Sequence, residues 1–346
     1  MAKVKYGVIG AGAIAQRRHM PEGQANPHST IAAIADPVGS RVDQLADEYQ
    51  AAGYTDYRKM LKEADIDAVV VAGPNSLHAK MTIDALKAKK HVLCEKPMAT
   101  TRADAKRMIK AAKDNRRYLM IGLNQRLMAP HVRAKEILDS GKLGRPLSFR
   151  TAFKHPGPEG WSVDGAKSWF FKKSEAFMGV TGDLGVHKAD LMRWLLGQEF
   201  SHVGGILATL DKRGPDRKLI SLDDNAYLTL RSEKGIVGSM ILSWTNYGAE
   251  ENYTVVYCTE GVLRIGDDPD YGVIVDYRNG DQELHKVGAM ATNEAQVASG
   301  IIDALTDSIR RKRKPVIDGV VGYRTLNVIL TAMEAAKQNR TLRIRY

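Results

Sequence analysis

The chain has 346 residues, of which 44% are hydrophobic and 26% are charged, and its formal net charge is +11. This length exceeds what one modest core accommodates, so we expect two domains of a soluble globular protein. No stretch approaches the roughly 18 uninterrupted apolar residues of a membrane span, and the two cysteines, with no secretory pattern after Met1, favour a cytoplasmic protein without disulfides or a membrane partner.

Residues 1–124 alternate strand-like and helix-like segments. Residues 69–72 are apolar at consecutive positions, as expected for a strand that is covered on both faces. The alternation predicts an α/β domain with a doubly wound parallel sheet. The predicted strands span residues 5–9, 30–35, 68–72, 91–94 and 118–123, and the predicted helices span residues 14–25, 40–51, 57–63, 78–88 and 102–115.

A glycine-rich turn, Gly10-x-Gly12-x-x-Ala15, follows the first predicted strand and opens a helix. Gly10 permits the tight turn, Gly12 lets the backbone approach a pyrophosphate, and Ala15 keeps the helix close to the sheet. Ala13 and Ile14 lie in the same turn and are expected to contact the cofactor. Glycines also serve ordinary strand–helix turns, but the position inside a βαβ unit favours dinucleotide binding.

Asp36 ends the second predicted strand. A carboxylate there accepts hydrogen bonds from the adenosine ribose hydroxyls and repels a 2′-phosphate, which favours NAD over NADP. Arg41 is close enough in sequence to contact the same part of the cofactor and to soften this discrimination. The alternative is that Asp36 only begins the turn with Pro37.

Polar residues follow the third predicted strand, at the carboxyl edge of the sheet where a cofactor lies in this architecture. We expect Pro74, Asn75 and His78 to border the cofactor. An equally good interpretation makes Asn75 a helix cap and places His78 in the first turn of that helix.

The segment Glu95-Lys96-Pro97 follows the fourth predicted strand and reaches the same edge. Proline fixes the local turn, so it can direct Lys96 into the crevice rather than continue the strand. A lysine desolvated beside a nicotinamide cation is suited to proton transfer near neutral pH. Taken alone, the segment fits an exposed lysine in a turn better.

Residues 125–346 have a different pattern. Repeated β-rich runs between residues 202 and 285, with turn signals such as Asn279-Gly280, predict an antiparallel sheet. The basic run 310–314 ends a predicted helix, where cations interact favourably with the helix dipole; a polyanion site is the alternative, and we expect no nucleic-acid partner. The predicted helices span residues 130–139, 183–196, 294–311 and 319–338, and further strands span residues 146–154 and 342–345.

Asp183, His187 and Asp190 share one face if their segment is helical. His187 is a candidate base for a sugar hydroxyl, and Asp183 either orients it or binds a neighbouring hydroxyl. The same residues are compatible with a metal or a buried capping network, but no cysteine or second histidine stands at ligand spacing, so we expect no metal. Further candidates for contact with the substrate are Asp190, His155, Trp244 and Tyr247.

Together these segments resemble the Gfo/Idh/MocA family of oxidoreductases, which includes inositol dehydrogenases and glucose–fructose oxidoreductase. The resemblance covers essentially the whole chain. It implies an N-terminal Rossmann domain, a C-terminal α/β domain with a large open, mostly antiparallel sheet, a catalytic group of Lys96, Asp183 and His187, and a contact of Glu95 with the cofactor ribose. It rests on the glycine-rich turn, Pro74-Asn75-x-x-His78, Glu95-Lys96-Pro97, Asp183-x-x-x-His187-x-x-Asp190 and the following Trp194-Leu-Leu-Gly197.

One departure from the family pattern lies just before Asp183. The family usually carries two or three consecutive glycines there, whereas this chain reads Met178-Gly-Val-Thr-Gly182, with only Gly179 inside the usual run. We therefore expect the wall of the substrate pocket to differ.

The expected function is reversible, NAD-dependent oxidation of a secondary ring hydroxyl of an inositol or sugar to a ketone. His187 takes the hydroxyl proton, Lys96 holds the oxygen, and Asp183 anchors an adjacent hydroxyl. One alternative is a redox-neutral enzyme that keeps NAD bound and cleaves or epimerises glycosides; another is a nicotinamide-sensing regulator without turnover. The apolar run 236–242 predicts a homodimer or homotetramer that covers one face of the antiparallel sheet.

Overall fold

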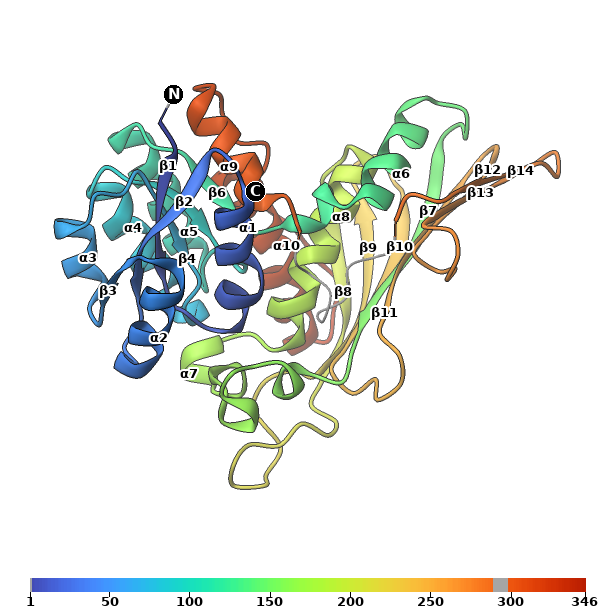
Figure 1. Ribbon diagram of the computed structural model, residues 1–346. Helices are drawn as coiled ribbons and strands as arrows, with labels where there is room; N and C mark the ends of the chain where they lie inside the picture. Colours follow the sequence, from blue (N-terminus) through green and yellow to red (C-terminus); the bar gives the residue numbers. More distant parts are fainter. Residues whose placement is uncertain (1, 289–297) are drawn as a thin grey trace.

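The structure is a computed structural model that describes residues 2–288 and 298–346. Two sheets lie side by side, with helices between and around them (Figure 1). The first has six strands in the order β3-β2-β1-β4-β5-β6, and the second has nine in the order β14-β13-β12-β11-β7-β10-β9-β8-β15. The predicted fold class, a Rossmann sheet followed by an open and mostly antiparallel sheet, is confirmed.

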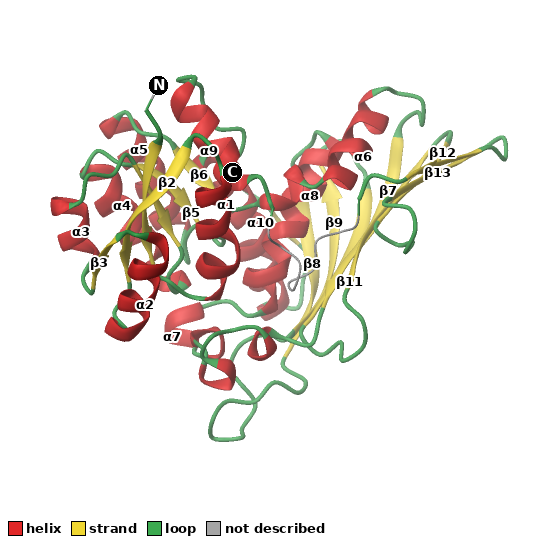
Figure 2. Cartoon of the chain, in the orientation of Figure 1, coloured by secondary structure: helices red, strands yellow, loops and turns green. Residues whose placement is uncertain are grey.

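Every pairing in the six-stranded sheet is parallel. Strand β4 is buried along its whole length, which its four consecutive apolar residues predicted. Helices lie on either side of this sheet (Figure 2). The strands are β1 (Val4–Ile9), β2 (Ser29–Ala35), β3 (Ala52–Tyr54), β4 (Ala68–Val71), β5 (His91–Cys94) and β6 (Leu119–Ile121), and the helices are α1 (Met20–Ala25), α2 (Gly39–Tyr49), α3 (Tyr57–Glu63), α4 (Asn75–Lys87) and α5 (Arg102–Asn115).

Three local predictions for this half need correction. Strand β3 was not predicted, because it has three residues at the sheet edge and no buried side chain to mark it. Helix α4 begins at Asn75 rather than at residue 78. The predicted helix over residues 14–25 is a π-helical turn, Ala15–His19, that continues into α1.

The nine-stranded sheet is antiparallel except where β10 pairs with β7. Strand β9 alternates buried and exposed residues over most of its length, as expected when only one face of a sheet is covered. The strands are β7 (Pro146–Lys154), β8 (Phe200–Ala208), β9 (Asn225–Ser232), β10 (Val237–Ser243), β11 (Glu251–Cys258), β12 (Gly261–Ile265), β13 (Val273–Tyr277), β14 (Gln282–His285) and β15 (Leu342–Arg343).

Helices α8 and α10 fill the space between the two sheets and cover the inner face of the larger one (Figure 1). The helices of this half are α6 (Ala129–Asp139), α7 (Lys173–Ala176), α8 (Val186–Leu196), α9 (Ile301–Arg310) and α10 (Gly319–Lys337). The predicted helix over residues 294–311 begins only at Ile301; its start, residues 294–297, lies outside the described residues. The division into domains at residue 124 stays a prediction.

The basic run 310–314 begins at Arg310, the last residue of α9, which agrees with its interpretation as a charged helix end. Within it, the Arg311 Nε atom lies 2.6 Å from Asp307 Oδ1, and Lys314 pairs with Asp318. These arginine and lysine side chains are therefore partly neutralised by neighbouring carboxylates. In the described part of the chain, no helix is long and apolar enough to cross a membrane.

Candidate active site

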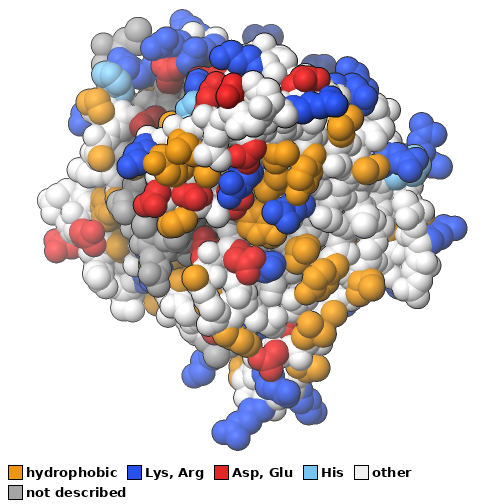
Figure 3. Space-filling view, turned by 90° about the vertical axis from the view of Figure 1, so that its right-hand side faces the viewer, with side chains coloured by type: hydrophobic (Ala, Val, Ile, Leu, Met, Phe, Trp, Pro, Cys, Tyr) orange, Lys and Arg blue, Asp and Glu red, His pale blue; other side chains and the backbone are white. Residues whose placement is uncertain are grey.

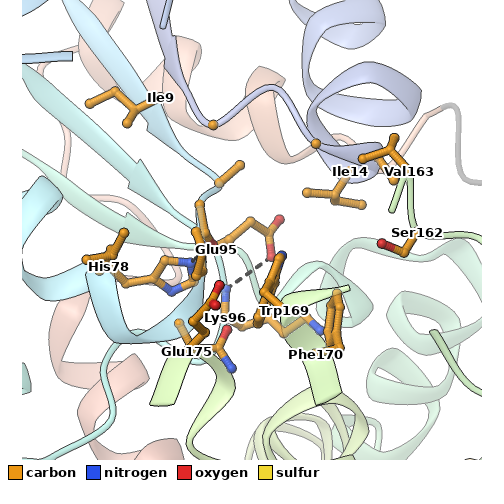
Figure 4. A pocket seen from close by; sticks show the side chains of 18 of the residues that line it. Ile9, Ile14, His78, Glu95, Lys96, Ser162, Val163, Trp169, Phe170 and Glu175 are labelled. Carbon is orange, nitrogen blue, oxygen red and sulfur yellow. Dashed lines mark hydrogen bonds between the residues drawn. The ribbon is translucent and has the colours of Figure 1, made fainter. Parts of the chain in front are cut away.

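A cavity of about 1050 Å³ lies where the two halves meet. Figure 4 shows Glu95 and Lys96 in this cavity, with Ile14 of the glycine-rich turn on one side and Trp169 and Phe170 nearby. The volume is at the upper end of the range for small-molecule sites, as a dinucleotide together with a substrate requires. All the residues predicted to bind the cofactor line it: Gly10, Gly12, Ala13, Ile14, Asp36, Arg41, Pro74, Asn75, His78, Glu95 and Lys96.

The two glycines of the turn are needed for different reasons. Gly10 has φ +87°, and a Cβ atom placed on it would lie 2.7 Å from the backbone nitrogen of Gly73. The fold itself therefore requires glycine at this position. A Cβ atom on Gly12 would meet nothing within 4 Å, so this residue faces open space in the cavity. This open cradle at a strand–helix turn fits the pyrophosphate of a dinucleotide.

Asp36 is held in place by the turns around it. Its Oδ2 atom accepts a hydrogen bond from the Ala11 backbone N–H at 2.9 Å, and its Oδ1 atom accepts one from Val38 N–H at 3.0 Å. Arg41 Nη1 lies 3.2 Å from the same Oδ1 atom. Asp36 thus organises the local turn and also lines the cavity, so the two interpretations of this residue are compatible.

Lys96 is not an exposed turn residue. Its side chain is only 14% exposed, and its Nζ atom donates to Asp183 Oδ1 at 2.6 Å and to the Asp183 backbone oxygen at 3.0 Å. Burial favours the neutral form of Asp183, but Lys96 and His155 outweigh it and hold the pKa of Asp183 well below its usual range. The pair therefore joins an ionised carboxylate of one half to the lysine of the other.

His187 lies in the same cavity, at the start of α8. Burial and, secondarily, the charge of Lys96 lower the pKa of His187 to about 3, so the imidazole is neutral near physiological pH. Its buried Nδ1 atom has no hydrogen-bond partner in the part of the chain that the structure describes, which leaves Nε2 as the nitrogen that can face the cavity. Among the described residues no hydrogen bond joins His187 to Asp183. The structure therefore shows no direct contact through which Asp183 would orient His187.

A π-helical turn, Thr181–Gly185, explains the arrangement of this segment. It carries Asp183 toward Lys96 and precedes the regular α-helix on which His187 lies. The departure from the family's glycine run also falls here. Residues 178–182 do not line the cavity, and Gly179 instead packs against the backbone of Asp223. The expectation that this departure changes the pocket wall is therefore not supported by its position.

In the described part of the chain none of the four further substrate candidates lines the cavity, and their contact with a substrate stays a prediction. Trp244 is fully buried and donates its indole N–H to Asp183 Oδ2 at 3.0 Å. His155 Nε2 lies 3.7 Å from the same oxygen. Both residues therefore contact the Asp183 oxygen that does not bind Lys96, and they help to hold the carboxylate in place.

The other two lie further away. Asp190 continues the helical face, but one turn deeper, where both its oxygens lie 2.5 Å from the guanidinium of Arg126. Tyr247 is 62% exposed and its hydroxyl donates to Asp211. Asp190 is therefore engaged in an ion pair with Arg126, and Tyr247 lies on the surface of the protein.

Glu95 and His78 shape the turn that carries Lys96. Glu95 Oε1 lies 2.8 Å from His19 Nε2, and Glu95 Oε2 accepts the Lys96 backbone N–H at 3.0 Å. Burial raises the pKa of Glu95, but the bond to His19 helps to hold it well below its usual range. The two ring nitrogens of His78 lie 2.8 Å from the backbone oxygens of Pro97 and Gly73, so this side chain ties the turn to the end of β4.

Asn75 is not a helix cap. Its Nδ2 atom donates to the backbone oxygen of Ala176 at 2.9 Å and thereby joins α4 to α7. Sequence reasoning also missed several polar residues that line the cavity, among them Arg18, Gln125 and Asn252. The sequence signal that could have found them is a polar residue at a position where the hydrophobic pattern of the strand or helix predicts a buried side chain.

Comparison with known proteins agrees with this geometry. A family model described as an oxidoreductase family with an NAD-binding Rossmann fold matches residues 4–123, and a GFO/IDH/MocA C-terminal domain model matches residues 131–264. Levoglucosan dehydrogenase of Pseudarthrobacter phenanthrenivorans is 34% identical over 229 residues, covering 60% of this chain and 57% of the relative. Inositol 2-dehydrogenase of Salmonella typhimurium is 30% identical over 203 residues, covering 58% and 56%. The chain thus aligns with little more than half the length of these two curated relatives.

Solved structures match over the whole chain. Aldose–aldose oxidoreductase from Caulobacter crescentus has a TM-score of 0.84 at 27% identity, covering 99% of this chain and 100% of the other. A levoglucosan dehydrogenase in complex with NADH and L-sorbose has a TM-score of 0.83 at 26% identity, covering 100% of both chains.

Proposed function

The chain belongs to the Gfo/Idh/MocA family of oxidoreductases, and from this premise we propose that it acts in the cytoplasm as an NAD-dependent dehydrogenase of a polyhydroxylated ring. The proposed reaction is the reversible oxidation of a secondary ring hydroxyl of an inositol, a sugar or a sugar derivative to a ketone. One observation carries the proposal: Lys96, Asp183 and His187 line the same cavity as the glycine-rich turn.

NAD bound at that turn would supply the acceptor for the hydride that leaves the alcohol carbon. The residues of the chain handle the proton and the oxygen. His187 is neutral and has an accessible nitrogen, so it can accept the proton of the reacting hydroxyl. Its surroundings disfavour the charged form, so the proton does not stay on the ring once the alcohol is oxidised.

Lys96 is proposed to hold the reacting oxygen. An ammonium group has three N–H donors, and Lys96 uses two contacts on Asp183, which leaves one donor for the substrate. Asp183 is a positioning residue in this scheme, because its two carboxylate oxygens already accept bonds from Lys96 and Trp244. This differs from the sequence-based expectation that Asp183 anchors a substrate hydroxyl.

A substrate panel tests the proposal. The protein is incubated with NAD and with inositols, aldoses, anhydrosugars, glycosides and sugar nucleotides, and the absorbance of NADH is followed. We expect NADH to appear with at least one polyhydroxylated ring. Product formed without any NADH would favour the redox-neutral alternative, and no turnover on any compound would favour a regulatory protein.

Cofactor preference gives a second test. The carboxylate of Asp36 lines the cavity next to the turn of the glycine motif, so it is expected to repel a 2′-phosphate. Asp36→Ser should weaken NADH binding and strengthen NADPH binding, with Arg41 released to contact the added phosphate. Fluorescence titration of both nucleotides measures the ratio. Native protein that binds NADPH at least as tightly as NADH would contradict this assignment.

The uncovered face of the nine-stranded sheet leads to a third prediction, which concerns self-association of the chain. Ile206, Tyr227 and Val237 are 69%, 51% and 44% exposed, and Figure 3 shows apolar side chains among charged ones on the side to which this sheet turns. We expect a homodimer or homotetramer that buries this surface. Light scattering at micromolar concentration should give two or four times 38.1 kDa. The mass of a monomer would contradict the predicted self-association.

A further inference from the structure

Two buried amide side chains in the wall of this cavity have polar atoms without hydrogen-bond partners in the described part of the chain. Asn252, on β11, is 6% exposed, and neither its Oδ1 nor its Nδ2 atom has a partner. Gln125, in the short 3₁₀ helix Asn124–Leu127, is 3% exposed, and its Oε1 atom has none. Both residues line the cavity that holds Lys96 and His187.

Such amides need an explanation, because buried polar groups in native proteins are nearly always hydrogen-bonded. A structural role does not supply it: Asn252 contributes no side-chain hydrogen bond to the sheet in which it lies. A buried amide without partners destabilises the protein relative to an apolar side chain of the same shape. The missing partners are therefore expected to come from a molecule that enters the cavity.

The position of Asn252 indicates which molecule this is. In the sheet Asn252 pairs with Phe153 of β7, and the Phe153 ring, which also lines the cavity, lies 6.4 Å from the ring of His187. The glycine-rich turn and Asp36 follow strands β1 and β2 of the six-stranded sheet, whereas β7, β11 and α8 belong to the other half. The Asn252 amide thus belongs to the part of the cavity wall that carries the proposed base.

We propose that Asn252 and Gln125 are specificity-determining residues that bind hydroxyl groups of the substrate ring other than the reacting one. This inference rests on the proposed function. A neutral amide offers one acceptor and two N–H donors, which match a hydroxyl group because it both donates and accepts. The substrate class is therefore a ring with hydroxyls on carbons beside the reacting one, rather than a simple cyclic alcohol.

A site built to bind a hydroxyl rejects an analogue that lacks it, because the buried polar groups of the site are then left unpaired. The same reasoning predicts how the free protein responds to mutation. Asn252→Leu and Gln125→Met remove unsatisfied amides while they keep the approximate size of the side chain. They should leave the melting temperature unchanged or raise it, and they should weaken substrate binding.

Asn225 provides a matched control. It is also a buried asparagine of the nine-stranded sheet, but its Nδ2 atom donates to Asp224 Oδ1 at 3.0 Å and to Thr245 Oγ1 at 2.9 Å, and it does not line the cavity. Asn225→Leu should therefore lower the melting temperature and leave KM unchanged in the folded protein.

The experiment compares the three variants with wild-type protein on myo-inositol, levoglucosan and their monodeoxy derivatives. For Asn252→Leu and Gln125→Met we expect KM to rise by roughly tenfold or more, with NADH affinity unchanged and with less discrimination against one deoxy derivative. A readout without turnover is the rise in melting temperature that myo-inositol or levoglucosan causes in the NADH complex, which these two variants should lose.

The outcomes separate this inference from the proposed function. Wild-type turnover with an unchanged KM in both variants would overturn the inference alone. A fall in melting temperature as large as that of Asn225→Leu would also overturn it, because it would show that the amides serve the fold. If no member of the panel is oxidised by the wild-type protein or stabilises its NADH complex, the proposed function fails, and the inference fails with it.

Discussion

Replacing Lys96 or His187 by alanine is expected to lower kcat by roughly 100-fold or more, the usual scale for the loss of positioned acid–base help, while NADH binding is kept. His187 has no hydrogen-bond partner in the described part of the chain, so His187→Ala should remove the base at little cost in hydrogen bonding. Steady-state kinetics and NADH titration on the same preparations measure both quantities.

Lys96→Ala requires an additional control, because it leaves the buried carboxylate of Asp183 without its cation. Breaking such a pair costs about 3–5 kcal/mol in the free energy of unfolding. The double variant Lys96→Ala with Asp183→Asn removes the unpaired charge and should recover much of this stability, but not turnover. Near-wild-type kcat in both Lys96→Ala and His187→Ala would contradict the mechanism, whatever their melting temperatures are.

Gly12→Val is expected to abolish NADH binding without loss of stability. The added side chain meets no protein atom near its Cβ position and extends into the open part of the cavity, where the pyrophosphate is expected. The valine side chain would occupy the space through which the backbone approaches the pyrophosphate. Fluorescence titration with NADH and a thermal melt are sufficient measurements.

Gly10→Ala is the matched comparison and should behave in the opposite way. Its Cβ atom would lie within 2.8 Å of the backbone of Ala72 and its φ is +87°, so the melting temperature should fall. Tight NADH binding by Gly12→Val would show that the pyrophosphate lies elsewhere. An undisturbed melting temperature in Gly10→Ala would contradict the geometry of this turn.

Both sheets were predictable because the residues that build them carry local signals. Consecutive apolar residues marked β4, and β-rich runs separated by turn signals marked the antiparallel strands. Strand β3 has neither signal, since it lies at an edge with its side chains largely outside the core. The start of α4 was misplaced because Asn75 makes its hydrogen bond to the distant Ala176 rather than to its own helix, a contact that no local pattern reports.

The candidate site was predictable as a list of residues but not as a network. Spacing placed Asp183 and His187 together, and a predicted strand end placed Lys96 at the cavity. The partners of Asp183 were hidden, because Trp244 is 61 positions away in the chain and reaches it only through the fold. The partner of Asp190 was hidden for a related reason: the next turn of the helix leads to Arg126, a residue that is distant in the chain, and a contact of Asp190 with the substrate stays a prediction.

The ratio of NADH formed to ketone formed tests the central claim most directly. The protein is supplied with excess NAD and the best substrate of the panel, NADH is followed by absorbance, and the carbonyl product is quantified by mass spectrometry. The account predicts one NADH for each ketone, with both lost in His187→Ala. Steady formation of a cleaved or epimerised product while NADH stays at the level of the enzyme would contradict it and would make the net chemistry redox-neutral.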